Sequence, residues 1–189
     1  MAITGLTAFR CIEWDGSKWK SPARFLVWDS PVVWATCKGS PQCPQDEDGH
    51  IIIREGCHCG IHGTLRDDEF REYMNSEERV GLLVESLGRI IIEPSDAWER
   101  GLRRETYSQI WMHDQGFTAS GVLVVGVINL GLFGQLIAPA TWKRELSKQT
   151  LAAKMAADFF KCQILDYESA RLVCRTMWEK YGGVWTLAD

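Results

Sequence analysis

Residues 50–63, "HIIIREGCHCGIHG", place three histidines and two cysteines within fourteen positions. Such a cluster can hold a metal ion, form a redox pair or supply a catalytic nucleophile, and each role needs different partners elsewhere in the chain. We interpret the stretch as part of a metal site that pins a loop. The glycines around the cysteines allow the sharp backbone turns that such a site requires.

Four side chains form our preferred set of metal ligands. Structural zinc takes four ligands in a tetrahedron, drawn mainly from thiolates and imidazoles. Cys57 and Cys59 are separated by one residue, and His50 lies seven residues before the first of them. Further upstream, Cys37 follows the apolar stretch "VVWAT". The sequence therefore predicts a Cys₃His zinc site made of Cys37, His50, Cys57 and Cys59.

Other ligand sets stay open, because the spacing differs from the paired C-x-x-C of zinc fingers. Cys43 could replace Cys37 or His50, and His50 could also be replaced by a histidine of the cluster. The middle residue of a C-x-C pair tends to point away from a metal held by its neighbours, which weakens the case for His58. Cys43 and His62 are therefore the alternative metal ligands.

A catalytic role for the cluster is the weaker interpretation. A C-x-C disulfide closes a strained ring, and no thioredoxin-like βαβ pattern surrounds it. A thiol-dependent or hydrolytic enzyme centred on Cys57 to His62 is a second alternative, and it would need a histidine oriented by a third group. Four protein ligands leave no open position on zinc. We therefore expect a structural site with no catalytic residues, and a protein that is not an enzyme.

The composition restricts the class of protein. The 189 residues suffice for one domain with an appended helical segment, and the formal net charge of -4 argues against a protein that coats phosphate backbones. The N-terminal stretch "MAITGLTAFR" lacks the features of a secretory signal. We expect a cytoplasmic protein, in which the seven cysteines stay reduced.

One long apolar run needs its own interpretation. Residues 120–140, "SGVLVVGVINLGLFGQLIAPA", carry no charge over a length that could cross a bilayer. Glycines, a proline and two amides interrupt the run, which favours buried strands joined by glycine turns. We therefore do not favour a membrane protein.

The order of the remaining patterns predicts an α+β fold. Short strands flank the turn signal Asp15-Gly16, and "RVGLLVES" and "GRIIIEP" predict two further strands, with a third near "RETYSQIWM". Between the cluster and these strands, Thr64 could cap a short helix that ends near Asn75 and turns Phe70 and Met74 inward. Residues 1–140 are expected to form a mainly β domain, and residues 37–63 its metal-binding loop.

The C-terminal segment, residues 141–189, has helical patterns. Apolar residues recur at helical spacing in two stripes, the first made of Leu151, Met155, Phe159 and Cys162 and the second running from Ala170 to Tyr181. Asp166 is a candidate N-cap of the second helix. The expected architecture is thus an antiparallel β-sheet with a zinc-pinned loop and a C-terminal helical hairpin packed on it.

The nine tryptophans favour a protein that binds another protein, because exposed aromatic side chains mark contact sites. A basic stretch supports a different partner, a nucleic acid, although the acidic net charge counts against it. The candidate binding surface for either partner consists of Trp98, Arg100, Arg103, Arg104, Tyr107 and Trp111.

Several short motifs resemble those of an uncharacterised family of small proteins from actinobacteria and their phages. The family reads an aromatic-Arg strand, A-x-C, a histidine seven residues before C-x-C-G-I-[YH]-A, G-R-V and G-x-R-A-E. The corresponding residues here are Phe9-Arg10, Ala35-Thr36-Cys37, His50, Cys57 to Gly63, Gly88-Arg89-Ile90 and Gly101 to Glu105. The resemblance covers about the first 105 residues and a closing "EKYGGVW".

The resemblance implies that Cys37, His50, Cys57 and Cys59 belong together, but it brings no activity with it. The chain departs from the family at Ile52-Ile53, where H-x-A-P is usual, and at Leu87, where tryptophan is usual. Residues from about 113 to 145 look inserted relative to the family. On this resemblance we expect an accessory factor of a phage or bacterium.

Overall fold

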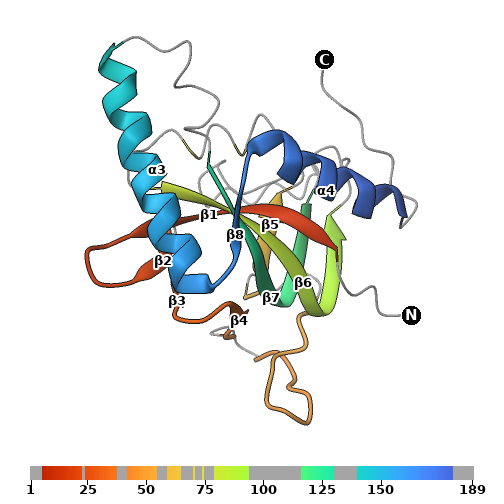
Figure 1. Cartoon of the computed structure of the whole chain (residues 1–189). Helices are drawn as coiled ribbons and strands as arrows, with labels where there is room; N and C mark the ends of the chain where they lie inside the picture. The colour runs from red at the N-terminus through yellow and green to blue at the C-terminus, as the bar shows by residue number, and fades with distance from the viewer. Residues whose placement is uncertain are drawn as a thin grey trace, which may run out of the picture.

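The described residues form an α+β fold with a mostly antiparallel sheet, as the sequence predicts, and this sheet has eight strands in the described part of the chain (Figure 1). The computed structural model describes residues 6–22, 24–37, 42–54, 59–64, 70, 74, 79–93, 116–129 and 140–180. The strands are β1 (Thr7–Trp14), β2 (Trp19–Ser21), β3 (Arg24–Trp28), β4 (Val32–Trp34), β5 (Ile61–Thr64), β6 (Arg79–Glu93), β7 (Gly116–Ile128) and β8 (Gln163–Leu165). The two C-terminal helices are α3 (Ala140–Phe160) and α4 (Tyr167–Lys180).

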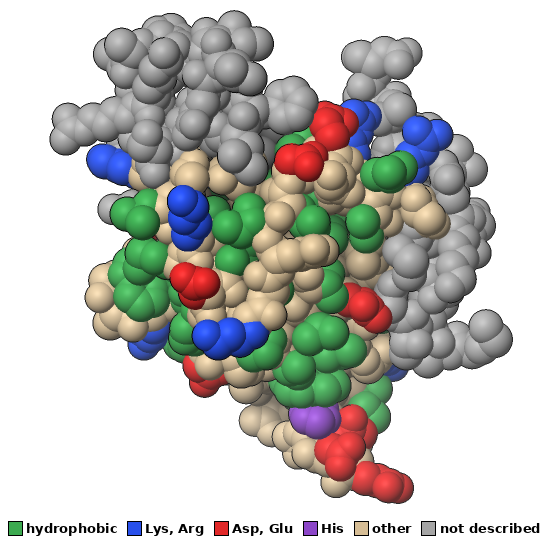
Figure 2. Space-filling view, viewed as in Figure 1, with side chains coloured by type: hydrophobic (Ala, Val, Ile, Leu, Met, Phe, Trp, Pro, Cys, Tyr) green, Lys and Arg blue, Asp and Glu red, His purple; other side chains and the backbone are tan. Residues whose placement is uncertain are grey.

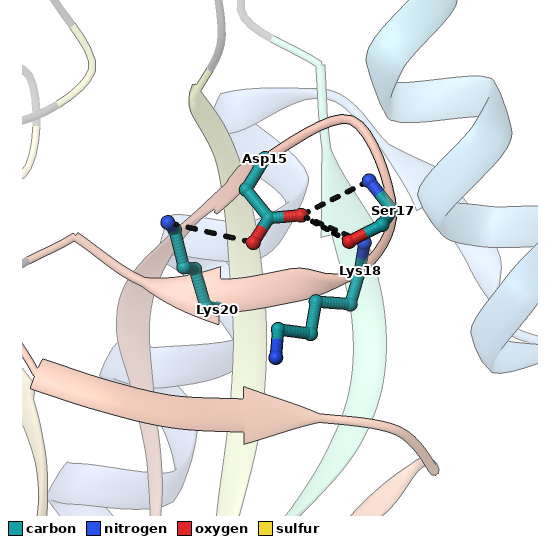
Figure 3. A network of polar contacts seen from close by, with 4 residues as sticks. All are labelled: Asp15, Ser17, Lys18 and Lys20. Atoms are coloured by element: carbon teal, nitrogen blue, oxygen red, sulfur yellow. Dashed lines mark hydrogen bonds and ion pairs between the residues drawn. The ribbon is translucent and has the colours of Figure 1, made fainter.

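The first hairpin joins β1 to β2 through the predicted Asp15-Gly16 turn (Figure 3). One carboxylate oxygen of Asp15 accepts hydrogen bonds from the backbone N–H groups of Ser17 and Lys18 and from the Ser17 hydroxyl. These bonds, led by the one from the Ser17 N–H, lower the pKa of Asp15. Gly16 has a φ of +92°, which glycine adopts without strain. The turn residues thus fix the register of the hairpin.

Strands β6 and β7 form the longest pair in the sheet. The sequence predicts two strands where β6 is a single one, and the junction between them corresponds to a shift in register between Leu87 and Ile90, where Gly88 has a φ of +69°. Both strands are rich in β-branched residues, which suit a buried sheet. Strand β1 pairs with β6 and β5, and β5 pairs with β7, so these four strands form a closed circuit of pairings.

The apolar run lies in β7 as far as Ile128, so the prediction of buried strand is confirmed. The predicted glycine turn at Gly126 is wrong, because β7 continues through this residue as one strand. Residues 130–139 lie outside the described residues, as does the predicted strand near "RETYSQIWM". Within the described chain, no helix combines the length and the apolarity needed to span a bilayer.

Two hydrophobic cores use alternating residues of the same strands. In β1, Ala8 belongs to the first core and Phe9 to the second. The first core includes residues of α3, and the second includes residues of α4 together with Phe70 and Met74. Because successive strand residues point to opposite faces, the two helices cover different faces of the sheet. The backbone N–H of Met74 donates to the Phe70 carbonyl, as in the helical turn predicted there.

The connection between the helices is a short strand, β8, which pairs in parallel with the end of β7. The two predicted C-terminal helices are thus present, and β8 lies between them in the chain. Their contacts are with the sheet: α3 contacts β6, β7 and β8, and α4 contacts β1 and β7. The predicted Asp166 cap is confirmed, since its carboxylate accepts hydrogen bonds from the Ser169 N–H at 2.8 Å and the Ser169 hydroxyl at 2.7 Å.

Helix α3 turns a different face inward from the one predicted. Its buried residues are Ala153, Ala156, Ala157 and Phe160. The stripe expected to pack, Leu151, Met155 and Phe159, is exposed. Small alanine side chains let the helix approach the sheet closely, so the larger residues point outward. The sequence pattern marks an apolar stripe on this helix but does not say which side the sheet takes.

Replacing the cap of α4 is expected to lower stability in a pH-dependent way. Asp166→Ala should reduce the free energy of unfolding by about 1 kcal/mol at pH 7, because the Ser169 N–H loses its acceptor. Hydrogen bonds from the Ser169 N–H and hydroxyl lower the pKa of Asp166 in the folded protein. The stabilisation is therefore fully present at pH values above the unfolded-state pKa of about 4, and it is lost as the pH falls through the lowered folded-state pKa. Urea unfolding at several pH values measures the effect.

Asp166→Asn is the matched control, because asparagine caps helices about as well and does not titrate. It should keep most of the stability at pH 7 and lack the loss in acid. If Asp166→Ala and the wild-type protein were equally stable at pH 7, the capping role would be wrong.

Candidate metal centre

Three cysteine thiols meet at one point of the structure. The sulfur atoms of Cys37, Cys43 and Cys59 all lie within 4.8 Å of one another. Those of Cys43 and Cys59 are 3.4 Å apart. A tetrahedral zinc ion with Zn–S bonds of about 2.3 Å places its sulfur ligands roughly 3.8 Å apart. The three-cysteine group, Cys37, Cys43 and Cys59, can therefore hold a metal ion.

Strand β7 brings Cys37 and Cys59, the first and last cysteines of this group, close together. Strand β4 pairs with one edge of β7 and ends opposite Gly121, while β5 pairs with the same edge and begins opposite Ala119. The chain that leaves β4 and the chain that enters β5 are thus neighbours along β7. Cys37 lies three residues after β4 and Cys59 two residues before β5, so both cysteines lie near the same short part of β7.

Ser120, between these two pairing positions, strengthens the junction. Its carbonyl accepts a hydrogen bond of 2.9 Å from the Ala35 N–H, which continues the pairing beyond the end of β4. Its hydroxyl accepts one of 3.4 Å from the Ile53 N–H in the loop. One buried residue of β7 thereby bonds to chain on both sides of Cys43.

Gly60 lets the chain at Cys59 approach β7. A Cβ atom at this position would lie 2.1 Å from the Thr118 Cγ2 atom and 3.1 Å from the Ala119 carbonyl oxygen. Any other residue would have to move the backbone away from β7 or displace the threonine. The glycine after the C-x-C pair is thus required by close packing.

Cys43 lies in a loop that folds back on itself. Gln45 and Ile51 form an isolated bridge, and the Ile52 N–H donates to the Pro44 carbonyl at 2.7 Å. The side chains of Ile51 and Ile53 are buried in the first core, which anchors the returning arm of the loop. The loop, residues 42–54, projects from the sheet in Figure 1, and acidic side chains gather at its tip in Figure 2.

The surroundings of the sulfur atoms suit bound metal. The Cys43 N–H donates to the Cys37 sulfur at 3.2 Å, a hydrogen bond that stabilises negative charge on a thiolate. Cys43 itself is buried, and Cys37 and Cys59 are half-buried against the first core. Thiolates brought together away from water need a cation to offset their charge.

His50 lies outside the three-cysteine group. Its ring stacks on Trp34 with 3.6 Å between ring centroids, and its Nδ1 atom is 3.7 Å from an Asp46 carboxylate oxygen. With Asp46 and Asp48 it forms a separate group whose ligand atoms also lie within 4.8 Å of one another. The structure thus brings together the predicted Cys37 and Cys59 and the alternative Cys43, but not the predicted His50.

The Trp34 ring also explains how the loop is held on the sheet. A Cβ atom on Gly121 would lie 2.5 Å from a carbon of this ring, so the indole lies directly against the backbone of β7. His50 stacks on the same indole. This contact gives His50 a structural role that does not require metal.

The other predicted residues lie elsewhere or outside the described chain. His62 is in β5, and its Nδ1 atom is 2.7 Å from the Thr118 hydroxyl oxygen. Cys57 and His58 lie outside the described residues. So does the whole predicted binding surface of Trp98, Arg100, Arg103, Arg104, Tyr107 and Trp111.

Three other cysteines belong to packing. Burial raises the pKa of the Cys11 thiol to about 12, and burial also raises the pKa of Cys162. Cys174 is fully buried in the second core. A thiol whose pKa is raised by burial is a poor nucleophile at neutral pH.

Comparison with known proteins finds no matching family model, no matching curated protein and no matching solved structure.

Enlarging Gly60 is expected to disturb the centre. Gly60→Ala should lower the free energy of unfolding by about 1–3 kcal/mol, because the added methyl group overlaps the Thr118 Cγ2 atom. Thermal unfolding measured by circular dichroism reports the change.

Thr118→Ser is the matched second change, since it removes that methyl group and keeps the hydroxyl near His62. The double variant should recover part of the stability that Gly60→Ala loses. Purely additive losses would contradict the packing described here.

Proposed function

We propose that the chain is a non-enzymatic interaction module in which one zinc ion holds residues 37–63 against the sheet. The observation that carries the proposal is the convergence of Cys37, Cys43 and Cys59. A thiolate-rich set favours zinc over hard cations such as calcium and magnesium, which prefer oxygen. The role of the metal is to fix a surface that another protein recognises.

The fourth ligand in this proposal is Cys57. It is separated from Cys59 by a single residue, a spacing at which both thiolates can bind the same ion. The ligand set then becomes four thiolates with the spacing C-x5-C-x13-C-x-C. This revises the sequence prediction by placing Cys43 where His50 was expected, and it agrees with the stacking of His50 on Trp34.

The compartment and the biological setting are part of the proposal. Zinc-binding thiolates persist in the reducing cytoplasm, where disulfides do not compete. The motifs shared with small proteins of actinobacteria and their phages support an accessory role in a phage or bacterium. A protein is the proposed partner, and the net charge of -4 disfavours nucleic acid.

Metal analysis of the purified full chain tests the site. We expect one zinc per chain in the wild-type protein, and its loss from Cys37→Ser, Cys43→Ser, Cys57→Ser and Cys59→Ser. His50→Ala should keep the metal, while losing about 0.5–1.5 kcal/mol of stability with its stack on Trp34. Cys162→Ser is the matched control among the cysteines and should also keep the metal.

Two outcomes would contradict the proposal. Loss of zinc from His50→Ala with retention in Cys43→Ser would return the site to the Cys₃His set. Rapid alkylation of a single cysteine of residues 57–59 in the zinc-loaded protein would favour the thiol-enzyme alternative, because a metal-bound thiolate reacts slowly.

A further inference from the structure

Helix α3 exposes a row of large apolar side chains. Leu151, Met155 and Phe159 are 60%, 43% and 44% exposed, although the helix already buries its opposite, alanine-rich face. They follow one another at intervals of four residues, so they form one continuous ridge along the helix, here called the α3 ridge. Hydrophobic side chains lie among charged ones on the α3 side of the molecule in Figure 2.

The charges beside the ridge are arranged asymmetrically. Lys154 and Asp158 each come one residue before a ridge residue, so both lie on the same flank of the ridge. Both side chains are exposed, and within the described chain neither forms an ion pair. This flank therefore presents an exposed cation and an exposed anion one helical turn apart.

We propose that the α3 ridge binds the α3 ridge of a second copy of this chain, in an antiparallel pair related by a twofold axis at Met155. Such an axis places Leu151 of one copy opposite Phe159 of the other, and Met155 opposite itself. The contact is self-complementary, as a twofold interface must be. It buries the three apolar side chains of the ridge in each copy.

The same axis pairs the flanking charges. It keeps each flank facing the equivalent flank of the other copy, and it brings Asp158 opposite position 152 of that copy. Lys154 of the other copy is two residues from that position, which is about 3 Å along the helix. Two symmetric Lys154–Asp158 pairs therefore close the contact.

The charge of Asp158 also bears on the choice of partner. A lipid surface is a poorer partner. Asp158 lies beside the ridge, so its negative charge would be brought against anionic headgroups and the apolar layer beneath them. The pattern of charge thus favours a second copy.

Sedimentation velocity of the full chain from low micromolar to near-millimolar concentration tests the proposal. The contact is small, so we expect a reversible dimer whose mass approaches twice the 21.4 kDa of one chain as concentration rises. Leu151→Gln should remain monomeric throughout. Leu172→Gln is the matched control, because Leu172 is a leucine on α4 with a similar exposure of 64%, and it should dimerise as the wild-type protein does.

Charge reversal distinguishes the proposed dimer from nonspecific association of exposed apolar surface. Lys154→Glu and Asp158→Lys should each weaken dimerisation roughly fivefold, because each places like charges across the axis. The double variant restores opposite charges and should restore the dimer. A wild-type protein that stays monomeric at all concentrations would overturn the proposal, as would equal loss of dimer in Leu151→Gln and Leu172→Gln. Binding of a monomer to phosphatidylserine vesicles through the ridge would assign it to lipid instead.

Discussion

The pairing of two short strands along one edge of β7 is the constraint on which the metal centre depends. Strand β4 ends and β5 begins on either side of Ser120, so the chain leaves the sheet and returns to it at nearly the same place. The chain between these strands makes a long excursion, and part of its described backbone hydrogen-bonds within the loop itself. Closing such a loop costs conformational entropy, and a metal ion bound by ligands at its start, middle and end would offset that cost.

Contacts with the sheet add to the hold on the loop without involving metal. Trp34 lies against the backbone of β7 at Gly121, and His50 stacks on Trp34. Ile51 and Ile53 are buried in the first core. The apolar residues therefore attach the loop to the sheet independently of metal, and we expect the sheet and the second core to persist in metal-free protein.

The sequence predicts much of the fold because its strongest signals are local. The Asp15-Gly16 turn, the Asp166 cap and the buried run in β7 are each specified by residues within a few positions. Long-range pairing is not specified in this way. The face that α3 buries depends on how closely Ala153 and Ala156 can approach the sheet, and the strand β8 depends on an open edge of β7. The spacing of apolar residues along the sequence predicts neither the buried face of α3 nor the pairing of β8.

In the candidate metal site, too, local sequence identifies some residues, and the others depend on how distant parts of the chain fold together. Spacing identifies Cys37 and Cys59 as candidates, but the choice between His50 and Cys43 depends on how the loop of residues 42–54 folds back. Gln45 pairs with Ile51, and the ring of His50 turns to Trp34. The available signal was Trp34 itself, an aromatic residue at the end of a strand that offers a stacking surface for a histidine.

X-ray absorption at the zinc edge of the metal-loaded protein tests most directly whether sulfur atoms from these separated positions bind one ion. We expect a shell of four sulfur ligands at about 2.3 Å. A first shell dominated by nitrogen or oxygen at about 2.0–2.1 Å would contradict it.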